Sequence, residues 1–163
     1  RQRQMCIRDR GLGSGSLKPI NANHDTEYHS SSVYSGSFDY QWPLSSWLST
    51  SLMVHESGGE GSMLTKSEYK SYKSGIIGLQ LKIWMGPLYL GVHGGQYYLT
   101  WIESMSAYSG IQQAGGSGYS IGFETSSGWF LAAFSDQSET FSFDEMPDQQ
   151  LEGNRVMLGY RWK

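Results

Sequence analysis

Apolar and polar side chains alternate at every second position in several separate segments of the chain. In residues 74–85, for example, one phase is apolar and the other carries Gln80 and Lys82. A period of two predicts a β-strand with one apolar face and one polar face. Eight segments follow this pattern, near residues 11–17, 34–42, 48–55, 74–85, 88–101, 119–124, from 129 onward, and 155–162.

Short and long connections alternate between these segments. Short turns lie near Pro43, Pro87 and Ser127, and the four other connections are long and polar, near residues 18–31, 56–70, 103–116 and 136–148. This rhythm predicts an all-β fold, an eight-stranded antiparallel up-and-down transmembrane β-barrel. In the fifth segment the apolar phase shifts by one residue at Gly94-Gly95, which predicts a β-bulge.

The polar phase of the strands indicates which face lines the barrel. It consists mostly of Ser and Gly, which fit the narrow interior of eight strands. A water-facing exterior would more naturally carry Lys and Glu. We therefore expect a polar lumen and an apolar outer face in contact with lipid. The predicted lipid-facing residues are Phe38, Leu52, Ile77, Leu79, Leu81, Ile121, Phe123, Val156, Leu158 and Tyr160.

Charged residues on the polar phase predict a cluster inside the lumen. Asp39 and Glu124 share this phase with Lys82, Arg155 and Arg161. An unpaired charge inside the barrel would be costly, so we expect Arg155 and Arg161 to pair with Asp39 and Glu124. The cluster is interpreted as a structural plug.

The tryptophans gather near the ends of the predicted strands. Membrane barrels carry aromatic residues at both membrane interfaces. The predicted rim aromatics are Trp42, Trp47, Trp84, Trp129 and Trp162 near the short turns and Trp101 toward the other rim. Trp47 and Trp84 fall on the polar phase, so they could instead plug the rim.

Composition supports a membrane barrel and sets the first ten residues apart. Only 17% of the 163 residues are charged, below the roughly 25% usual for soluble domains, and 14% are aromatic. Residues 1–10 carry four Arg and the single cysteine, Cys6, and look like translated sequencing-adapter read-through. We expect residues 11–163 to form the barrel domain.

The closing segment "VMLGYRW" resembles the last strand of small outer-membrane barrels of the OmpX/opacity type. The strand rhythm resembles that family over nearly all of residues 11–163. Lys163, which follows the terminal aromatic, departs from the family's pattern. The resemblance implies residence in a bacterial, Gram-negative outer membrane, with the long loops outside the cell and a structural or adhesion-like role. The implied partners are outer-membrane lipid, lipopolysaccharide and a host or cell-surface molecule, and a monomer is expected.

Candidate chemistry is sparse. His24 and His29 lie near acids but match no standard metal-ligand spacing, so neither a metal site nor a cofactor is expected. His55, Glu56 and Ser57 are neighbours, and neighbours in a strand point to opposite faces, which argues against a hydrolytic site. The acidic character of the chain argues against nucleic-acid binding. A narrow small-solute pore, a lipid-modifying enzyme and a soluble lipocalin-like ligand-binding barrel remain alternatives.

Overall fold

The computed structural model describes residues 5–19, 28–63, 66–103, 107–108, 111–142 and 148–161. It describes side chains for residues 36–58, 72–100, 111–142 and 148–161. The strands are β1 (Met5–Pro19), β2 (Tyr28–Pro43), β3 (Leu48–Met63), β4 (Lys66–Met85), β5 (Leu88–Glu103), β6 (Ala107–Tyr108), β7 (Gln112–Glu124), β8 (Trp129–Phe141) and β9 (Gln149–Arg161).

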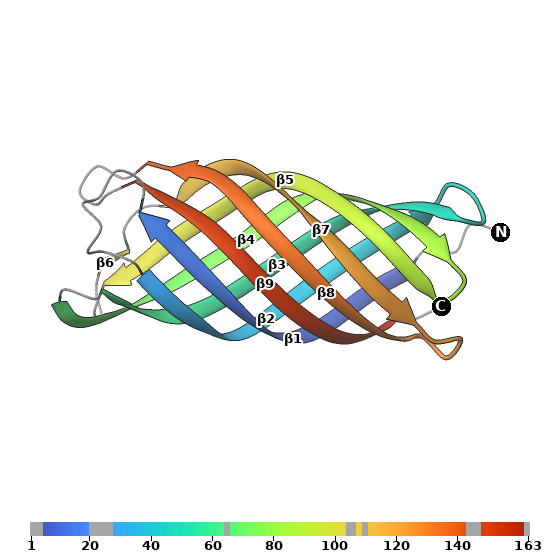
Figure 1. The fold of residues 1–163 in the computed structure, drawn as a ribbon, viewed down its shortest axis with the longest axis horizontal. Helices are drawn as coiled ribbons and strands as arrows, with labels where there is room; N and C mark the ends of the chain where they lie inside the picture. The colour runs from blue at the N-terminus through green and yellow to red at the C-terminus, as the bar shows by residue number, and fades with distance from the viewer. Residues whose placement is uncertain are drawn as a thin grey trace.

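Eight of these strands close into an elongated barrel (Figure 1). Each strand pairs antiparallel with the next one along the chain, and β1 pairs with β9 to complete the ring. The two-residue β6 lies beside β5 at the end that carries the long connections. The prediction of an all-β, eight-stranded, up-and-down antiparallel barrel is therefore confirmed. The described residues contain no helix long and apolar enough to cross a membrane.

Three short turns close one end of the barrel, at the positions that the sequence predicts. Gly86 adopts a positive φ of 65° before Pro87, in a two-residue hairpin turn that favours glycine. Gly128 also has a positive φ, of 99°, and its amide donates to the carbonyl of Thr125. In the turn after β2, the Ser45 hydroxyl accepts hydrogen bonds from the amides of Trp47 and Leu48.

The strands at the other end of the barrel extend beyond their predicted limits. The loop predicted at residues 56–70 is instead a continuation of β3 to Met63 and of β4 from Lys66. Likewise, β7 begins within the predicted loop 103–116, and β8 runs into the predicted acidic loop 136–148. Polar and glycine-rich residues can complete a backbone ladder here, with register shifts at Ser62/Met63 and at Gln137/Thr140.

The first strand also begins earlier than expected. Residues 5–10 pair with both β2 and β9, with Ile7 opposite Asp39 and Arg161. Because Gln41 and Arg161 lie near the short-turn end, a strand starting at Gly11 would leave the backbones of β2 and β9 unpaired there. The adapter origin of residues 1–10 stays a prediction.

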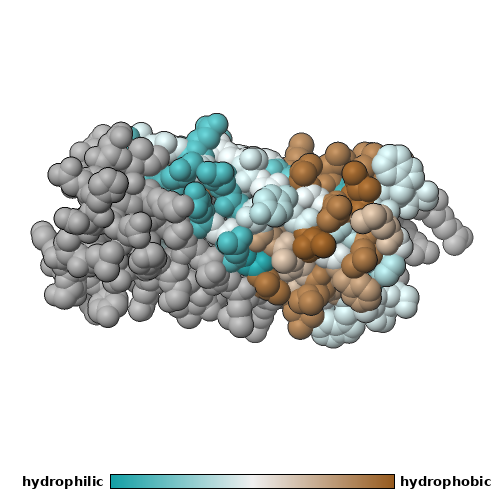
Figure 2. Space-filling view, viewed as in Figure 1, coloured by the Kyte–Doolittle hydropathy of each residue, from teal (hydrophilic) through white to brown (hydrophobic). Residues whose placement is uncertain are grey.

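The outer wall of the barrel changes character along its axis. Toward the short turns, outward side chains form an exposed apolar band, from Ile77 to Met85 in β4 and from Leu88 to Val92 in β5. Farther along the barrel, outward positions carry polar residues, such as Gln96 in β5 and Asn154 in β9. Figure 2 shows the apolar band toward the short-turn end and hydrophilic side chains beyond it.

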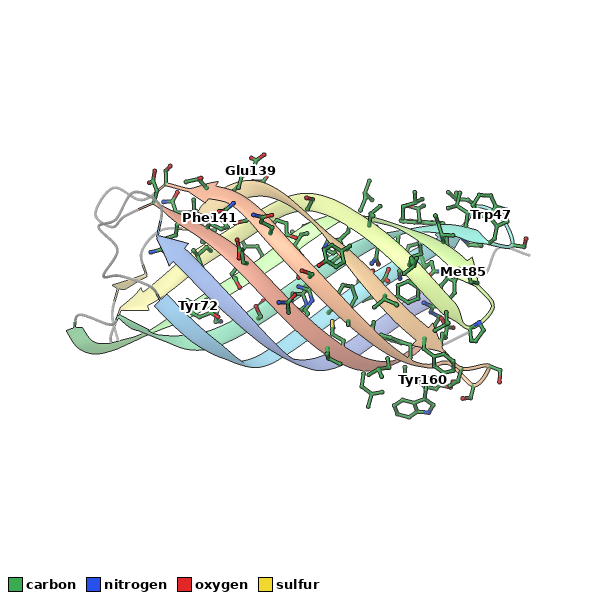
Figure 3. All side chains as sticks on the ribbon, viewed as in Figure 1. Trp47, Tyr72, Met85, Glu139, Phe141 and Tyr160 are labelled. Carbon is green, nitrogen blue, oxygen red and sulfur yellow. The ribbon has the colours of Figure 1, made fainter. Side chains whose placement is uncertain are left out.

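The interior changes in the opposite sense. Inside the apolar band the inward residues include polar and charged side chains beside a small apolar cluster of Tyr89, Phe130 and Ala132, and Gln80 is only 2% exposed while its neighbour Leu79 is 61% exposed. Beyond the band the interior is an apolar core, formed by Met53, Tyr72, Ile76, Tyr97, Leu99, Ala114 and Phe141. Tyr72 and Phe141 mark this end of the barrel in Figure 3.

This inversion explains the phase shift that the sequence shows at Gly94-Gly95. The pairing of β5 with β4 and with β7 continues through both glycines without a break in register. The predicted β-bulge is therefore wrong. Apolar residues change phase because the apolar face moves from the outside of the barrel to its inside.

Side chains of β5 fill the interior over a row of glycines in β7. A Cβ atom built at Gly122 would lie 2.2 Å from the Tyr89 ring, and one at Gly118 would lie 2.4 Å from His93. A Cβ atom built at Gly116 would lie 2.6 Å from the Tyr97 ring. Glycine at these positions gives the large side chains of β5 the space that they occupy.

Candidate functional site

Two ion pairs lie inside the barrel near the short-turn end. Lys82 Nζ donates to Asp39 Oδ2 over 2.5 Å, and both side chains are buried. Arg161 forms an ion pair with Glu124, and its Nη2 also donates to Gln41 Oε1 over 2.9 Å. The five predicted cluster residues thus lie inside the barrel, but they do not all pair as expected.

Arg155 pairs with Asp136 and not with Asp39. Its Nη1 donates to Asp136 Oδ2 over 2.5 Å. Residue 136 was predicted to begin an acidic loop, whereas it lies in β8, and its side chain is buried. The prediction for Arg155 is wrong because β8 is longer than expected and brings a second acid to the same level.

Asp136 is the centre of the most connected polar cluster in the lumen. Its Oδ1 atom accepts a hydrogen bond from the Tyr97 hydroxyl at 3.0 Å and lies 2.6 Å from His93 Nε2. An ionised carboxylate only accepts hydrogen bonds, so His93 carries a proton on Nε2. Three strands, β5, β8 and β9, are thereby tied together across the interior, and Tyr97 connects this cluster to the apolar core.

The charges of the described interior balance. Asp39, Glu124 and Asp136 supply three negative charges, and Lys82, Arg155 and Arg161 supply three positive ones. Aromatic rings add contacts to each cation, at 5.2 Å from Tyr89 to Lys82, 4.7 Å from Phe134 to Arg155 and 5.5 Å from Trp84 to Arg161. Paired and hydrogen-bonded charges of this kind can be kept inside a barrel, whereas unpaired ones cannot.

The two ends of the lumen differ. At the short-turn end a cavity of about 700 Å³ is lined by residues of all three turns, with Gln41, Glu124 and Arg161 also in its wall. We call this cavity the vestibule. At the other end an apolar core lies inside the barrel, and Tyr97 and Leu99 are almost completely buried. Among the described residues, the lumen thus has a cavity on the short-turn side and an apolar core on the other.

The predicted lipid-facing residues lie on the outer wall. All of them except Tyr160 are exposed large hydrophobic residues, and Tyr160 is half-buried beside Trp129, with ring centroids 5.4 Å apart.

The rim tryptophans divide into two groups. Trp42, Trp47 and Trp129 are exposed near the short turns. Trp84 faces the vestibule, where its indole Nε1 donates to Ser49 over 2.8 Å. The side chain of Trp101 and all of Trp162 lie outside the described residues.

The described residues offer little for catalysis. His55 is buried inside the barrel while Glu56 is exposed on the outside, so the two neighbours face opposite sides of the wall. Among the described residues, no group of three or more His, Cys, Asp and Glu could hold a metal ion. His24 lies outside them, as does the side chain of His29.

Comparison with known proteins identifies the fold. No family model matches the chain, and no curated protein matches its sequence. Among solved structures, Neisserial surface protein A aligns with a TM-score of 0.64 at 9% identity, covering 97% of each chain. Ail, the attachment invasion locus protein of Yersinia pestis, aligns with a TM-score of 0.64 at 10% identity, covering 98% of this chain and 99% of Ail.

A second structure of Ail, in complex with the heparin analogue sucrose octasulfate, aligns with a TM-score of 0.57 at 11% identity, over 98% of this chain and 99% of Ail. These proteins are outer-membrane β-barrels. At 9–11% identity the likeness establishes the fold alone. It confirms, for the fold, the resemblance to small outer-membrane barrels. The chain has the fold of a small eight-stranded outer-membrane β-barrel.

Proposed function

We propose that the protein is an integral outer-membrane barrel that presents its long connections at the cell surface in a structural or adhesion-like role. The observation that carries this proposal is the apolar band. In a water-soluble barrel the apolar face would point inward along the whole strand, whereas here it points outward over the short-turn half. Lipid is the environment that favours such a band.

The length of the band fits a membrane. Outward positions are free of charged and amide side chains over 11 residues in β4, from 75 to 85, and over 7 residues in β5, from 88 to 94. A tilted membrane-spanning strand needs roughly 9–11 residues, a length that the band reaches in β4 and falls short of in β5. The exposed Trp42, Trp47 and Trp129 then lie at one membrane interface. We place the short turns on the periplasmic side and the long connections outside the cell.

The interior supports an anchor over a pore. Among the described residues, three ion pairs and an apolar core occupy the lumen beyond the vestibule, which favours a closed interior. The proposed partners are membrane lipid, lipopolysaccharide and a surface partner contacted through the long connections, and the proposed state is a monomer. The Ail complex with a heparin analogue shows that a barrel of this fold can bind a sulfated ligand.

Cell fractionation and surface labelling would test the proposal together. The full chain, expressed behind a bacterial export signal, is expected in the outer-membrane fraction and to require detergent for extraction. An epitope inserted in residues 143–147 should be labelled on intact cells, and the same epitope inserted in the turn at residues 125–127 should not. Recovery in the water-soluble fraction would contradict the membrane assignment, and labelling of the turn alone would reverse the orientation.

Conductance in planar bilayers would test the filled lumen. The purified chain is expected to give no discrete current steps. Regular steps that persist in several preparations would instead support a small-solute pore.

A further inference from the structure

A small second cavity lies inside the barrel, between the Asp39–Lys82 pair and Arg155. Its volume is about 20 Å³, and Arg161 is part of its wall and also of the wall of the vestibule. The remaining wall is mostly aromatic and thioether side chains, from Met53, Tyr89, Phe130, Phe134 and Met157.

Several charged atoms of the lining residues have no protein partner among the residues that the structure describes. They are Asp39 Oδ1, Arg155 Nε and Nη2, and Arg161 Nε. Each belongs to a residue whose other polar atoms are paired, so only one side of each group is satisfied. A buried polar atom that is left unpaired costs about 1–3 kcal/mol, and more when it is charged.

The chemistry of these atoms selects the ligand. Arg155 and Arg161 offer only N–H donors, and Asp39 offers only an acceptor. An anion would be repelled by Asp39, a cation would be repelled by the two arginines, and the six charges of the interior side chains that the structure describes already balance. A small neutral molecule that both donates and accepts fits all of them.

The volume agrees with water. A cavity needs roughly 10–15 Å³ to hold one water molecule, and that molecule needs 2–4 polar partners. The cavity of about 20 Å³ meets the first condition, and Asp39 Oδ1 together with two of the three N–H groups meets the second, since one water molecule accepts at most two hydrogen bonds.

We propose that this cavity is an internal water site that joins the Asp39–Lys82 pair to the Asp136 cluster through Arg155. The vestibule supplies the water past Arg161, and the apolar core beyond Tyr97 stops it. The lumen is then a blind hydrated pocket, wet from the short-turn side and dry at the end of the long connections. This inference concerns the interior alone and stands whether or not the loops bind a partner.

Water-selective NMR cross-relaxation on the full chain, folded in detergent micelles, would test the site. Met157 lines the cavity, so its methyl group, labelled with ¹³C, is expected to show a cross-peak to a long-lived water molecule. Methyl groups of Leu99, in the apolar core, serve as the dry control and should show none. Absence of a cross-peak at Met157 under conditions where exposed methyl groups show one would overturn the proposal.

Two matched double variants would test the role of Asp39. Asp39→Asn with Lys82→Gln keeps a hydrogen-bonding side chain at both positions, and the Met157 cross-peak should persist. Asp39→Leu with Lys82→Met removes the acceptor, and the cross-peak should fall to the level of Leu99. Equal cross-peaks in both variants would show that Asp39 does not hold the water. Both variants remove the pair as a whole, so neither leaves a single buried charge behind.

Discussion

Leu158→Arg would place a cation in the outward apolar band of β9. Leu158 is exposed, and it lies between Val156 and Tyr160 on the same face of the strand. If lipid covers this face, the new charge lies within the hydrocarbon layer. An arginine on the lipid face near the bilayer midplane destabilises a membrane barrel by about 2–4 kcal/mol.

The same strand provides a matched control. Asn154 is exposed on the same face, four residues farther from the short turns. At about 3.3 Å per residue and a tilt of about 40°, it lies about 10 Å farther along the barrel axis. Asn154→Arg should therefore cost about 0–1 kcal/mol, as near a membrane interface. The difference of about 2 kcal/mol or more corresponds to a factor of about 30 in the folding equilibrium.

Reversible unfolding by denaturant in lipid bilayers would measure both variants, with heat-modifiable migration on gels as a check of folding. We expect Leu158→Arg to lower the free energy of unfolding clearly more than Asn154→Arg does. Equal losses in the two variants would refute the inference that lipid covers the band, because water would treat the two positions alike.

Three further predictions concern the interior and the polar part of the wall. Asp39→Ala should lower the free energy of unfolding by about 3–5 kcal/mol because it leaves Lys82 buried and unpaired, and a double variant with Lys82→Met should recover part of that loss in the same denaturant titration. Gly122→Ala should lower the free energy of unfolding by about 1–3 kcal/mol because the new Cβ atom would overlap the Tyr89 ring. Gly94→Ala should be nearly neutral in thermal unfolding, because its Cβ atom would lie 3.4 Å from the nearest atom, the carbonyl oxygen of Gly116. Tyr98 lies beyond the apolar band, where burial and, second, the carboxylate of Glu56 raise its pKa to about 12. The stability that the protonated Tyr98 hydroxyl contributes should therefore be complete below pH 10 and be lost as pH rises through about 12. Glu56→Gln should lower that pKa in a tyrosinate absorbance titration, with Tyr98→Phe identifying the signal.

The alternation of side chains predicted the architecture because a closed barrel imposes it directly. Each strand has one face inside and one outside, so a period of two survives in the sequence wherever those faces differ in polarity. Turn residues predicted the positions of the short connections equally well, because Gly86 and Gly128 have positive φ angles, which favour glycine.

The polar cluster was only partly predictable. Asp39, Lys82, Glu124, Arg155 and Arg161 belong to clean alternating segments, and the structure buries or half-buries all of them. Asp136 was missed because polar residues follow it on both phases, which is typical of a loop. The one available signal was charge balance. The predicted cluster held two acids and three bases, so a third acid was missing from it.

The interpretation of the long connections failed for a related reason. Sequence reasoning took one environment for the whole length of each strand, with lipid outside and polar groups inside. Beyond the apolar band the environments are reversed, so apolar residues such as Tyr97 and Leu99 change phase and polar residues occupy the outer wall. A change of phase without a break in pairing is how this reversal appears in a sequence.

The row of glycines in β7 has a consequence for how the strands find their register during assembly. Tyr89 and His93 of β5 lie directly opposite Gly122 and Gly118 of β7, and the Tyr97 ring, opposite Ala114, lies over Gly116. A slip of one residue would turn all three side chains to the outer face, and a slip of two would set them against other residues of β7, including the side chain of Ser120. The glycines therefore discriminate between alternative pairings as well as providing space. A flat strand rich in glycine and serine would otherwise be the kind most prone to misregister.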